Sequence, residues 1–286
     1  METIRLPRIM QETVMRERRS GKAVGFVPTM GALHEGHLSL VRAARAENDL
    51  VAVSLFVNPA QFAPGEDFDR YPGNAGDDLE KLSSSGLADI VFLPGKEAVY
   101  PPGFSTRVEV VGLSDRMCGR FRPGHFQAVA AIVLKLFNIV QPARAYFGQK
   151  DYQQAVVVKR MVRDLNLPVE ISVCPTVRDP DGLAMSSRNV YLSPEERQAA
   201  PALYRALRAA ADALEGGRRD AGGLGSLMRT VLGREPLFHG VDYISVFDPE
   251  TLDELENIDR DDVLIAGAAR IGGARLIDNL LVNNLK

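Results

Sequence analysis

Short apolar runs rich in β-branched residues recur along the first part of the chain. They cover residues 23–27, 51–57, 90–93 and 169–173. Such runs are typical of strands buried on both faces of a parallel sheet. Stretches with the apolar spacing of a helix lie between several of them, at residues 38–46, 77–84, 128–140 and 153–164. This alternation predicts an α/β fold with a doubly wound parallel sheet.

The pattern changes after residue 177, where we expect a second, smaller α+β domain. Ser193-Pro194-Glu195-Glu196 has the N-cap, the proline and the acidic first turn of a helix, and it predicts one long helix that ends near Leu214. Glycines near residues 216 and 222 interrupt the pattern. Strands are predicted at residues 243–247, 263–267 and 274–277. The expected domains are residues 1–177 and 178–286.

Composition is that of an ordinary globular protein. Of the 286 residues, 45% are apolar and 25% are charged, and the formal net charge is −3 at pH 7. A chain of this length can bury a sizeable core. Its charge gives no electrostatic footprint for nucleic acid, so no nucleic-acid partner is expected.

The apolar pattern predicts neither a secretory signal nor a membrane segment. Charged residues are spread through residues 1–21, and the longest apolar stretch, residues 128–140, is too short to span a bilayer. The two cysteines, Cys118 and Cys174, suggest neither a disulfide framework nor a zinc cluster. We therefore expect a cytoplasmic protein with no membrane partner.

A histidine pair stands where the first predicted strand passes into a helix. His34-Glu35-Gly36-His37 holds two of the four histidines, and Gly31 and Gly36 allow the backbone to approach a ligand closely. A helix start carries unpaired N–H groups and about +0.5 of an elementary charge, so it stabilises an anion. Spaced three residues apart, both imidazoles fall on one side of the first turn. They can donate hydrogen bonds to phosphate oxygens there, so this junction predicts a phosphate-binding site.

The pair has two other interpretations. Either histidine alone would more simply be a core residue, and it is the pair with its glycines that favours phosphate binding. A zinc site needs at least one further ligand, and the spacing differs from the His-Glu-x-x-His of a metalloprotease.

Three further loops carry polar side chains near predicted strand ends or helix starts. Asn58 and Gln61 have amides that suit a small ligand bearing hydroxyls and a carboxylate. The segment Gly148-Gln149-Lys150-Asp151 puts a lysine before a helix, where a phosphate or carboxylate would relieve its misfit with the helix dipole. Met185-Ser186-Ser187-Arg188 combines hydroxyls with a guanidinium, as a phosphate clamp does. An Asn-Pro turn, a solvated lysine and ordinary loop chemistry are the respective alternatives.

Together these blocks resemble the pantothenate synthetase (pantoate–β-alanine ligase) family, within the superfamily of nucleotidylyltransferases and class I aminoacyl-tRNA synthetases. His34-Glu35-Gly36-His37 is similar to the His-x-Gly-His signature, and Met185-Ser186-Ser187-Arg188 to the Lys-Met-Ser-Lys-Ser counterpart. Arg188 in place of the second lysine is usual for this family. More specific are residues 28–31, 56–62, 122–126 and 147–151. The resemblance covers nearly the whole chain.

The resemblance implies a Rossmann-like first domain that binds ATP and pantoate, and a second domain that forms a lid. It implies ATP-dependent condensation of (R)-pantoate with β-alanine to pantothenate, a step of coenzyme A biosynthesis. This ligase would form a C–N bond through a pantoyl adenylate and release AMP and pyrophosphate. ATP would be a co-substrate, Mg²⁺ would bridge its phosphates, and the protein would be a homodimer.

The resemblance also implies roles for individual residues. Those acting in adenylation would be His34, His37, Lys150, Ser186, Ser187 and Arg188. The ATP-binding set would be Met30, Gly31, Ala32, Leu33, His34, Glu35, Gly36, His37, Asn58, Gly148, Gln149, Lys150, Asp151, Val177, Met185, Ser186, Ser187 and Arg188. Gln61 and Gln154 would bind pantoate. Asp77 and Asp78 resemble an acidic pair that assists the metal ion, although a helix start explains two acidic residues equally well.

Other functions fit parts of the sequence. A nucleotidylyltransferase of the same superfamily would share the two-histidine loop and is the alternative enzyme. A tRNA ligase would need a basic face, which the acidic balance disfavours. A nucleotide-binding regulator without activity would have no need of His34, His37, Lys150 and Arg188 together. Whether His37 donates a proton or only stabilises charge is left open by the sequence.

Overall fold

The computed structural model describes residues 1–285, so the last residue of the expected second domain lies outside the described residues. The chain forms two compact units. The first comprises Met1–Ser114, Arg122–Gln149 and Gln154–Pro175, and the second comprises Asp115–Phe121, Lys150–Gln153 and Thr176–Lys286. The second unit thus takes in two short segments from the earlier part of the chain. A domain boundary at residue 177 stays a prediction.

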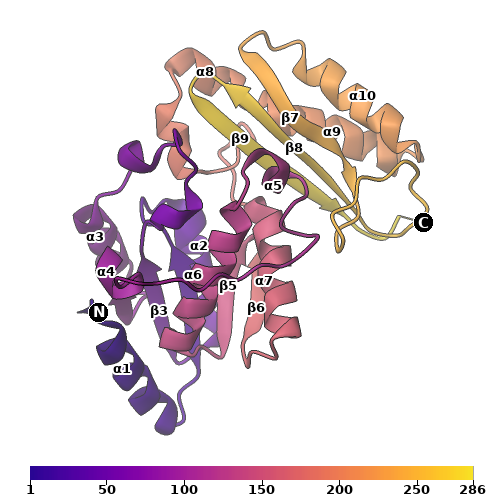
Figure 1. Ribbon diagram of the computed structural model, residues 1–286. Coiled ribbons are helices and arrows are strands. Elements are labelled where there is room, and N and C mark those ends of the chain that lie inside the picture. The colour runs from indigo at the N-terminus through magenta and orange to yellow at the C-terminus, as the bar shows by residue number, and fades with distance from the viewer. Residues whose placement is uncertain (286) are drawn as a thin grey trace. The chain divides into compact units, whose positions relative to one another are not determined.

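A six-stranded parallel sheet forms the centre of the first unit (Figure 1). Its strands have the order β1-β4-β3-β2-β5-β6. The strands are β1 (Glu2–Ile4), β2 (Val24–Thr29), β3 (Leu50–Leu55), β4 (Ile90–Phe92), β5 (Arg144–Gly148) and β6 (Glu170–Cys174). From β2 the chain adds β3 and β4 on one side, and β5 and β6 on the other. The gap between the carboxyl ends of β2 and β5 is therefore the topological switch point, where doubly wound sheets bind ligands.

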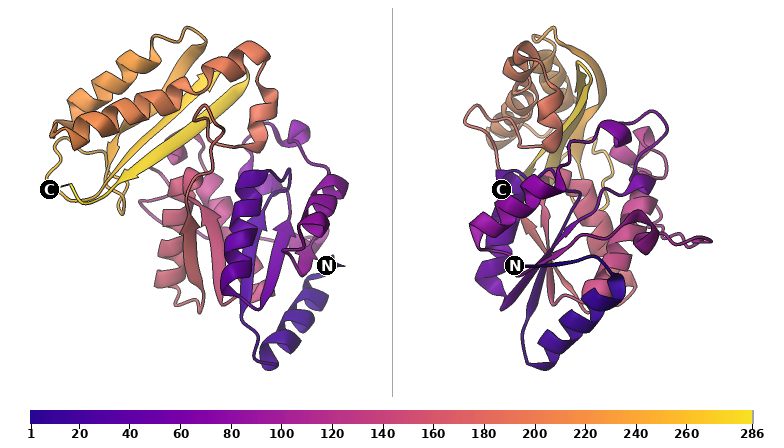
Figure 2. Two further views of the ribbon diagram at one scale, coloured as in Figure 1. Left: turned by 180° about the vertical axis from the view of Figure 1, so that it is seen from behind. Right: turned by 90° about the vertical axis from the view of Figure 1, so that its left-hand side faces the viewer.

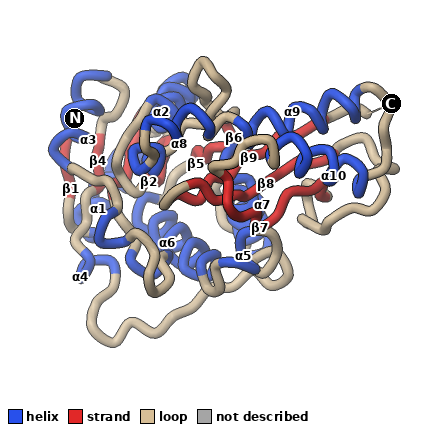
Figure 3. The backbone as a smooth tube through the Cα atoms, turned by 90° about the horizontal axis from the view of Figure 1, so that it is seen from above, coloured by secondary structure: helices blue, strands red, loops and turns tan. Residues whose placement is uncertain are grey.

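Helices cover both faces of this sheet, which confirms the predicted fold class. They are α1 (Pro7–Arg19), α2 (Glu35–Glu47), α3 (Ala75–Ser85), α4 (Lys96–Val99), α6 (His125–Val140) and α7 (Tyr152–Asp164). Figures 1 and 2 show α2 and α6 on opposite faces. On the α2 face, Leu40, Val41 and Ala44 pack on buried residues of β2 and β3. After α4 the chain runs as an extended loop through residues 100–114 (Figure 3).

The apolar pattern missed β1, α1 and the inner strand β5. Residues Arg144 and Tyr146 make β5 look polar in sequence, yet Tyr146 is fully buried. Its hydroxyl donates to Glu47 Oε2 at 2.7 Å and accepts from the Asn48 amide at 2.7 Å. Both partners of this buried oxygen lie almost a hundred residues away in sequence. A pattern of neighbouring residues cannot reveal such contacts.

The second unit holds a three-stranded antiparallel sheet in the order β7 (Phe238–Phe247), β8 (Val263–Ile271) and β9 (Ala274–Val282). Three helices belong with it, α8 (Pro194–Ala199), α9 (Ala202–Glu215) and α10 (Ala221–Leu232), and the one-turn α5 (Cys118–Phe121) comes from earlier in the chain. Helices α9 and α10 lie along the sheet (Figures 1 and 2). Their small and aliphatic residues form one apolar core with its strands.

The helix predicted from Ser193 to Leu214 is in fact two helices. Its start is as expected, because Ser193 and Glu196 form a capping box, with the Ser193 N–H donating to Glu196 Oε2 at 2.8 Å. The break comes at Pro201, which has no N–H to donate and whose ring crowds the preceding turn. The prediction of one continuous helix was wrong for this reason.

The glycine-rich stretch near residue 222, which the sequence predicted to interrupt the helical pattern, is itself part of a helix. It opens α10, in which Leu224, Met228 and Leu232 are all buried in the core of the second unit. Burial of these side chains outweighs the loss of about 1 kcal/mol that each helical glycine brings. Among the described residues, no helix combines the length and the apolar character needed to cross a membrane.

Candidate functional site

The loop between β2 and α2 is held in place by the side chain of Asp78. This aspartate lies in the first turn of α3 and is only 2% exposed. Its Oδ2 accepts the N–H of Ala32 at 2.8 Å, and its Oδ1 accepts the N–H of Leu33 at 2.7 Å. Lys81, one turn further along α3, donates to the Leu33 carbonyl at 2.8 Å. Two polar side chains of α3 thus fix the backbone of residues 32–33.

Gly31 is required by this anchoring. Its φ of +82° is a conformation that side chains other than glycine rarely adopt. A Cβ built there would lie 2.8 Å from Asp78 Oδ2, so a larger residue would push the carboxylate away from the loop. The close approach that the sequence predicted for this glycine is therefore to the chain's own carboxylate.

The neighbouring Asp77 is exposed and accepts from the Asn74 amide at 3.0 Å. The two members of the predicted metal pair thus have different surroundings, and Asp78 has each oxygen engaged by a backbone N–H. Within residues 1–285 no group of three or more His, Cys, Asp or Glu side chains is arranged to hold a metal ion. Metal binding by Asp77 and Asp78 stays a prediction.

The two histidines cap the helix that follows this loop. The Nδ1 atom of His34 accepts the Gly36 N–H at 3.1 Å, and Nδ1 of His37 accepts the His34 N–H at 3.4 Å. A ring nitrogen that accepts a backbone N–H carries no proton, so in each neutral ring the proton is on Nε2. The ring centroids lie 4.1 Å apart. The cap therefore orders two imidazoles that each have an Nε2–H donor.

Gly148 and Gln149 lie on the other side of the switch point, at the carboxyl end of β5. No atom comes within 4 Å of the position that a Cβ of Gly148 would occupy. The backbone is therefore accessible there, next to the strand that ends in the histidine loop. Gln154, the second glutamine expected to bind pantoate, is half-buried on α7.

Asn58 and Gln61 form a buried amide pair after β3. Asn58 is 1% exposed and Gln61 is 9% exposed. The Asn58 Nδ2 atom donates to Gln61 Oε1 at 2.8 Å, while Asn58 Oδ1 accepts from the Tyr100 hydroxyl at 2.8 Å. Asn58 thus has partners at both ends of its amide, and it supports Gln61 directly.

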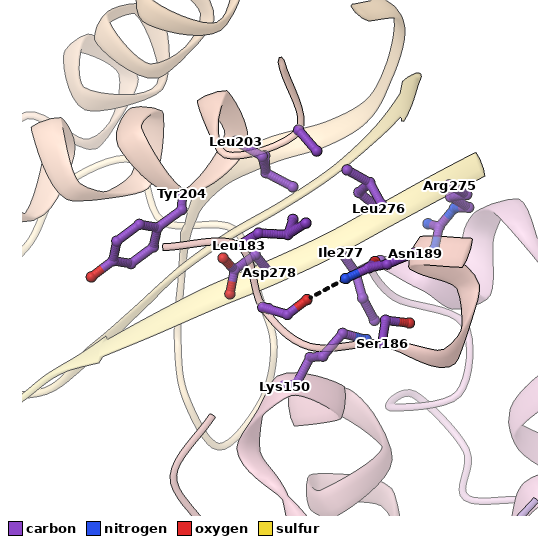
Figure 4. Close-up of a pocket in the computed structure, with 12 residues that line it drawn as sticks. Lys150, Leu183, Ser186, Asn189, Leu203, Tyr204, Arg275, Leu276, Ile277 and Asp278 are labelled. Atoms are coloured by element: carbon purple, nitrogen blue, oxygen red, sulfur yellow. Dashed lines mark hydrogen bonds between the residues drawn. The ribbon is translucent and has the colours of Figure 1, made fainter. Parts of the chain in front are cut away.

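In the second unit, Lys150 and Ser186 line a pocket (Figure 4). Asn189, Tyr204 and Asp278 also line this pocket. The Lys150 carbonyl accepts from the Asn279 amide at 2.9 Å, which joins this residue to β9. Its ammonium group is 3.9 Å from Asp151 Oδ2, too long for a hydrogen bond. The lysine side chain is 19% exposed, so it is neither well solvated nor tightly paired with Asp151.

A short hairpin brings Val177 and Met185 together, two residues expected to bind ATP. The Met185 N–H donates to the Val177 carbonyl at 3.0 Å. Arg178 then fixes the hairpin to β9 through a two-pronged ion pair with Asp278, at 2.6 and 2.8 Å. The guanidinium also lies 4.0 Å from the centre of the Tyr204 ring. These contacts determine where the following Ser-Ser-Arg segment begins.

Ser186 begins the one-turn helix formed by Ser187–Tyr191. Its Oγ accepts the Arg188 N–H at 3.3 Å, as an N-cap serine does. Ser187 and Arg188 are half-buried in this turn. The Asn189 amide donates to the Ala184 carbonyl at 3.1 Å. The segment is thus an ordered turn, and its two hydroxyls and guanidinium follow one another within it.

The residues expected to bind ligands are therefore distributed between the two units. The first unit holds Met30, Gly31, Ala32, Leu33, His34, Glu35, Gly36, His37, Asn58, Gln61, Gly148, Gln149 and Gln154. The second unit holds Lys150, Asp151, Val177, Met185, Ser186, Ser187 and Arg188. Sequence analysis missed Asp78 as the loop anchor and Arg178 as the hairpin anchor, because each acts on segments far away in sequence.

Comparison with known proteins gives consistent results. A sequence model of the family described as "Pantoate-beta-alanine ligase" matches residues 2–281. Pantothenate synthetase of Thermodesulfovibrio yellowstonii is 55% identical over 282 residues, 99% of this chain and 100% of that protein. The enzyme of the same name from Chloroflexus aurantiacus is 57% identical over 265 residues, 93% of this chain and 94% of its own.

Solved structures show the same similarity. Pantothenate synthetase from Thermus thermophilus superposes with a TM-score of 0.92 at 49% identity, covering 98% of this chain and 99% of that one. A pantoate-beta-alanine ligase from Francisella tularensis, solved with beta-gamma ATP and beta-alanine, gives a TM-score of 0.78 at 34% identity, covering 98% and 97%.

The role of Asp78 as a loop anchor can be tested with Asp78→Asn and Asp77→Asn. Both changes remove one negative charge from the first turn of α3, so their difference isolates the contact with the loop. In Asp78→Asn, one carboxylate oxygen is replaced by an NH₂ group, which cannot accept the backbone N–H that faces it. We therefore expect this change to lower the free energy of unfolding by about 1–3 kcal/mol. Asp77→Asn should change it by less than about 0.5 kcal/mol. Equal effects in chemical denaturation would exclude the anchoring role.

Acid should weaken the contact between Arg197 and the hairpin. Arg197 donates to Asp179 at 2.9 Å and to Asp181 at 2.5 Å, and its hydrogen bond holds the pKa of Asp181 below the usual 3.8. A lowered carboxyl pKa stabilises the fold above the unfolded value, and this contribution is lost as pH falls through the folded pKa. The difference in Tm between wild type and Arg197→Gln should therefore be present at pH 7 and shrink below pH 3.8. A difference that stays constant through the acid range would contradict this assignment.

Proposed function

The chain belongs to the pantoate–β-alanine ligase family, and we propose that it condenses (R)-pantoate with β-alanine to pantothenate, cleaving ATP to AMP and pyrophosphate. The observation that carries the proposal is the family match over residues 2–281. The relative from Francisella tularensis, whose structure holds an ATP compound and β-alanine, supports the choice of substrates. The protein is accordingly a ligase that forms a C–N bond.

In the first step, a carboxylate oxygen of pantoate attacks the α-phosphorus of ATP. The new P–O bond gives pantoyl adenylate, and the bond to the leaving pyrophosphate breaks. Negative charge grows on the phosphate oxygens, and it is stabilised best by donors that are already oriented. His34 and His37 supply such donors, because each Nδ1 accepts a backbone N–H of the helix cap and the proton of each neutral ring is therefore on Nε2.

Other residues bind and neutralise the two anions in this proposal. Lys150 and Arg188 supply positive charge, and Ser186 and Ser187 supply hydroxyl donors to the phosphates. Gln61 and Gln154 bind the hydroxyl and carboxylate oxygens of pantoate. Holding both reactants in line removes much of the entropic cost of their encounter.

In the second step, the amine of β-alanine attacks the acyl carbon of pantoyl adenylate. A C–N bond forms, the C–O bond to AMP breaks, and the amine loses its proton. AMP is a good leaving group, so the chemistry needs no covalent intermediate with the protein. Neither Cys118 nor Cys174 has a role in it.

Magnesium is proposed to accompany ATP. Mg²⁺ keeps several of its waters and is usually bound by substrate phosphates together with one or two carboxylates. Asp78 already accepts two backbone N–H groups, so exposed Asp77 fits the metal better than its neighbour does. The cation would reduce repulsion between the phosphates and the incoming carboxylate. The homodimer and the cytoplasmic location also stay predictions.

The reaction can be tested by following AMP release from ATP and pantoate with and without β-alanine. We expect steady turnover only with all three substrates, and pantothenate formed in equal amount to AMP. Without β-alanine, AMP should stop accumulating, because the adenylate stays on the enzyme. A nucleotidylyltransferase would instead turn over with a phosphorylated acceptor and release pyrophosphate without AMP, which would contradict the proposal.

The role of His37 predicts a specific pattern among variants. His37→Ala removes an oriented donor, and we expect kcat/KM for ATP to fall by about 10²–10³-fold. His37→Gln keeps an Nε2–H donor and should retain more activity. His239, exposed on β7, provides the control, because His239→Ala should leave kcat/KM unchanged. Wild-type rates in His37→Ala would remove this residue from the phosphate site.

A further inference from the structure

We propose that Glu66, Arg122 and His125 are positioning residues for pantoate, which act by holding the main chain of Gln61. The inference rests on the proposed function, in which Gln61 binds pantoate. It assigns a role to the Arg122-Pro123-Gly124-His125-Phe126 block, which sequence analysis left without one. Although 61 residues or more separate this block from Gln61, it lies in the same unit.

The carbonyl of Gln61 is held by two side chains from the start of α6. His125 Nδ1 lies 2.9 Å from this oxygen, and Arg122 Nη2 donates to it at 3.3 Å. A carbonyl oxygen only accepts hydrogen bonds, so Nδ1 carries the proton. His125 Nε2 is then an acceptor, and Arg122 Nη1 donates to it at 3.1 Å. These contacts fix the tautomer of His125 and the position of the Gln61 backbone together.

Glu66 holds the arginine in place. Arg122 Nε donates to Glu66 Oε1 at 2.8 Å and Nη2 donates to Oε2 at 2.7 Å, the fork geometry of an arginine–carboxylate pair. The side chains of Arg122 and Glu66 are 17% and 25% exposed. Glu66 also accepts the Ala63 N–H at 3.2 Å, so it closes the turn that carries Gln61. The guanidinium therefore has its direction set before it reaches the Gln61 carbonyl.

Partial burial favours the neutral form of Glu66, but the hydrogen bonds and charge of Arg122 outweigh it and lower the pKa of the carboxyl. Glu66 is thus ionised near neutral pH. The positioning group is a charge pair with a neutral imidazole beside it, rather than a set of neutral hydrogen bonds.

The side chain of Gln61 is oriented by a second set of contacts. The Ala60 N–H donates to Asn58 Oδ1 at 3.3 Å, and a backbone N–H cannot accept, so this end of the Asn58 amide must be oxygen. Asn58 Nδ2 therefore donates to Gln61 Oε1, at 2.8 Å. The opposite end of the Gln61 amide is an NH₂ donor. It suits a carboxylate or hydroxyl oxygen, as pantoate offers.

Main chain and side chain of Gln61 are thus fixed by different groups, and both are needed to aim the donor. An oriented donor is lost when its backbone shifts, even if the amide itself remains. Glu66→Gln would weaken the hold on Arg122 while preserving size. We therefore expect a defect in pantoate binding, with ATP binding unchanged.

The experiment is a double-mutant cycle of Glu66→Gln and Gln61→Ala, with KM measured for pantoate and for ATP. Losing one oriented hydrogen bond corresponds to about a tenfold rise in KM for pantoate. We expect this rise in each single variant, with KM for ATP within about twofold and Tm close to wild type. In the Gln61→Ala background, Glu66→Gln should cause no further rise, because the donor that it positions is gone.

Glu47→Gln is the matched control. Glu47 pairs with Arg144 at 2.5 Å, in the same unit but at the amino end of β5, away from Gln61. It should leave KM for pantoate unchanged. Arg122→Lys keeps the positive charge but cannot form the two-pronged pair with Glu66, so it should show the same rise in KM for pantoate alone. It serves as the second variant in case Glu66→Gln is unstable.

Three results would overturn the proposal. One is an equal rise in KM for ATP and pantoate in Glu66→Gln. Another is an effect of Glu66→Gln that multiplies with that of Gln61→Ala in the double variant. The third is an unchanged KM for pantoate in Gln61→Ala. Each would leave wild-type synthesis of pantothenate intact, whereas failure of the proposed function would show in the wild-type enzyme itself.

Discussion

The loop that leads into the two histidines depends on one buried carboxylate, that of Asp78. By accepting the N–H groups of Ala32 and Leu33, it fixes a loop that would otherwise leave two donors unpaired. The loop leads straight into α2, so its path sets where the helix begins and where both histidines stand. Gly31 is tied to the same contact, because only a glycine leaves room for the carboxylate. The positions of both histidines therefore depend on an aspartate of another helix.

The helix start is used in a different way from a simple phosphate trap. His34 and His37 satisfy backbone N–H groups of the first turn with their own Nδ1 atoms. Part of the positive end of α2 is thus paired within the chain. In the proposed function the donors to a phosphate are therefore the imidazoles rather than these N–H groups. An imidazole fixed at one nitrogen has a defined direction at the other, which favours recognition of a developing charge. The same reasoning applies to Gln61. Asn58 donates to the oxygen of its side-chain amide, so the other end of that amide is an NH₂ donor with a fixed orientation.

Much of the fold could be predicted because its signals are local. The strands β2, β3 and β4 are mostly apolar, β6 carries Ile171 and Val173, and the cap of α8 is a four-residue pattern. Strand β5 could not be predicted in this way, since the partners of Arg144 and Tyr146, among them Glu47 and Asn48, lie far away in sequence. The proline at position 201 is visible in the sequence, but the long amphipathic pattern around it led to the prediction of one continuous helix. To predict such a break, the helix-breaking tendency of a single proline has to be weighed against the helical spacing of the apolar residues around it.

The candidate site shows the same division. The histidine pair, the amide loop and the Ser-Ser-Arg segment are each contiguous, so their chemistry could be predicted from residue types. What orients them could not, because Asp78, Arg122 and Arg178 act across tens of residues. Asp78 illustrates the consequence most clearly, since in sequence it looks like a metal ligand or a dipole complement, and in the structure it binds backbone.

The central claim is that a carboxylate oxygen of pantoate attacks the α-phosphorus of ATP to give pantoyl adenylate. It is tested most directly with pantoate labelled with ¹⁸O in its carboxyl group. Attack through that oxygen leaves one labelled atom on the phosphate of AMP after β-alanine has displaced it, and mass spectrometry of the AMP should find that single label. AMP without label, formed together with pantothenate, would show that no pantoyl adenylate forms and would contradict this account.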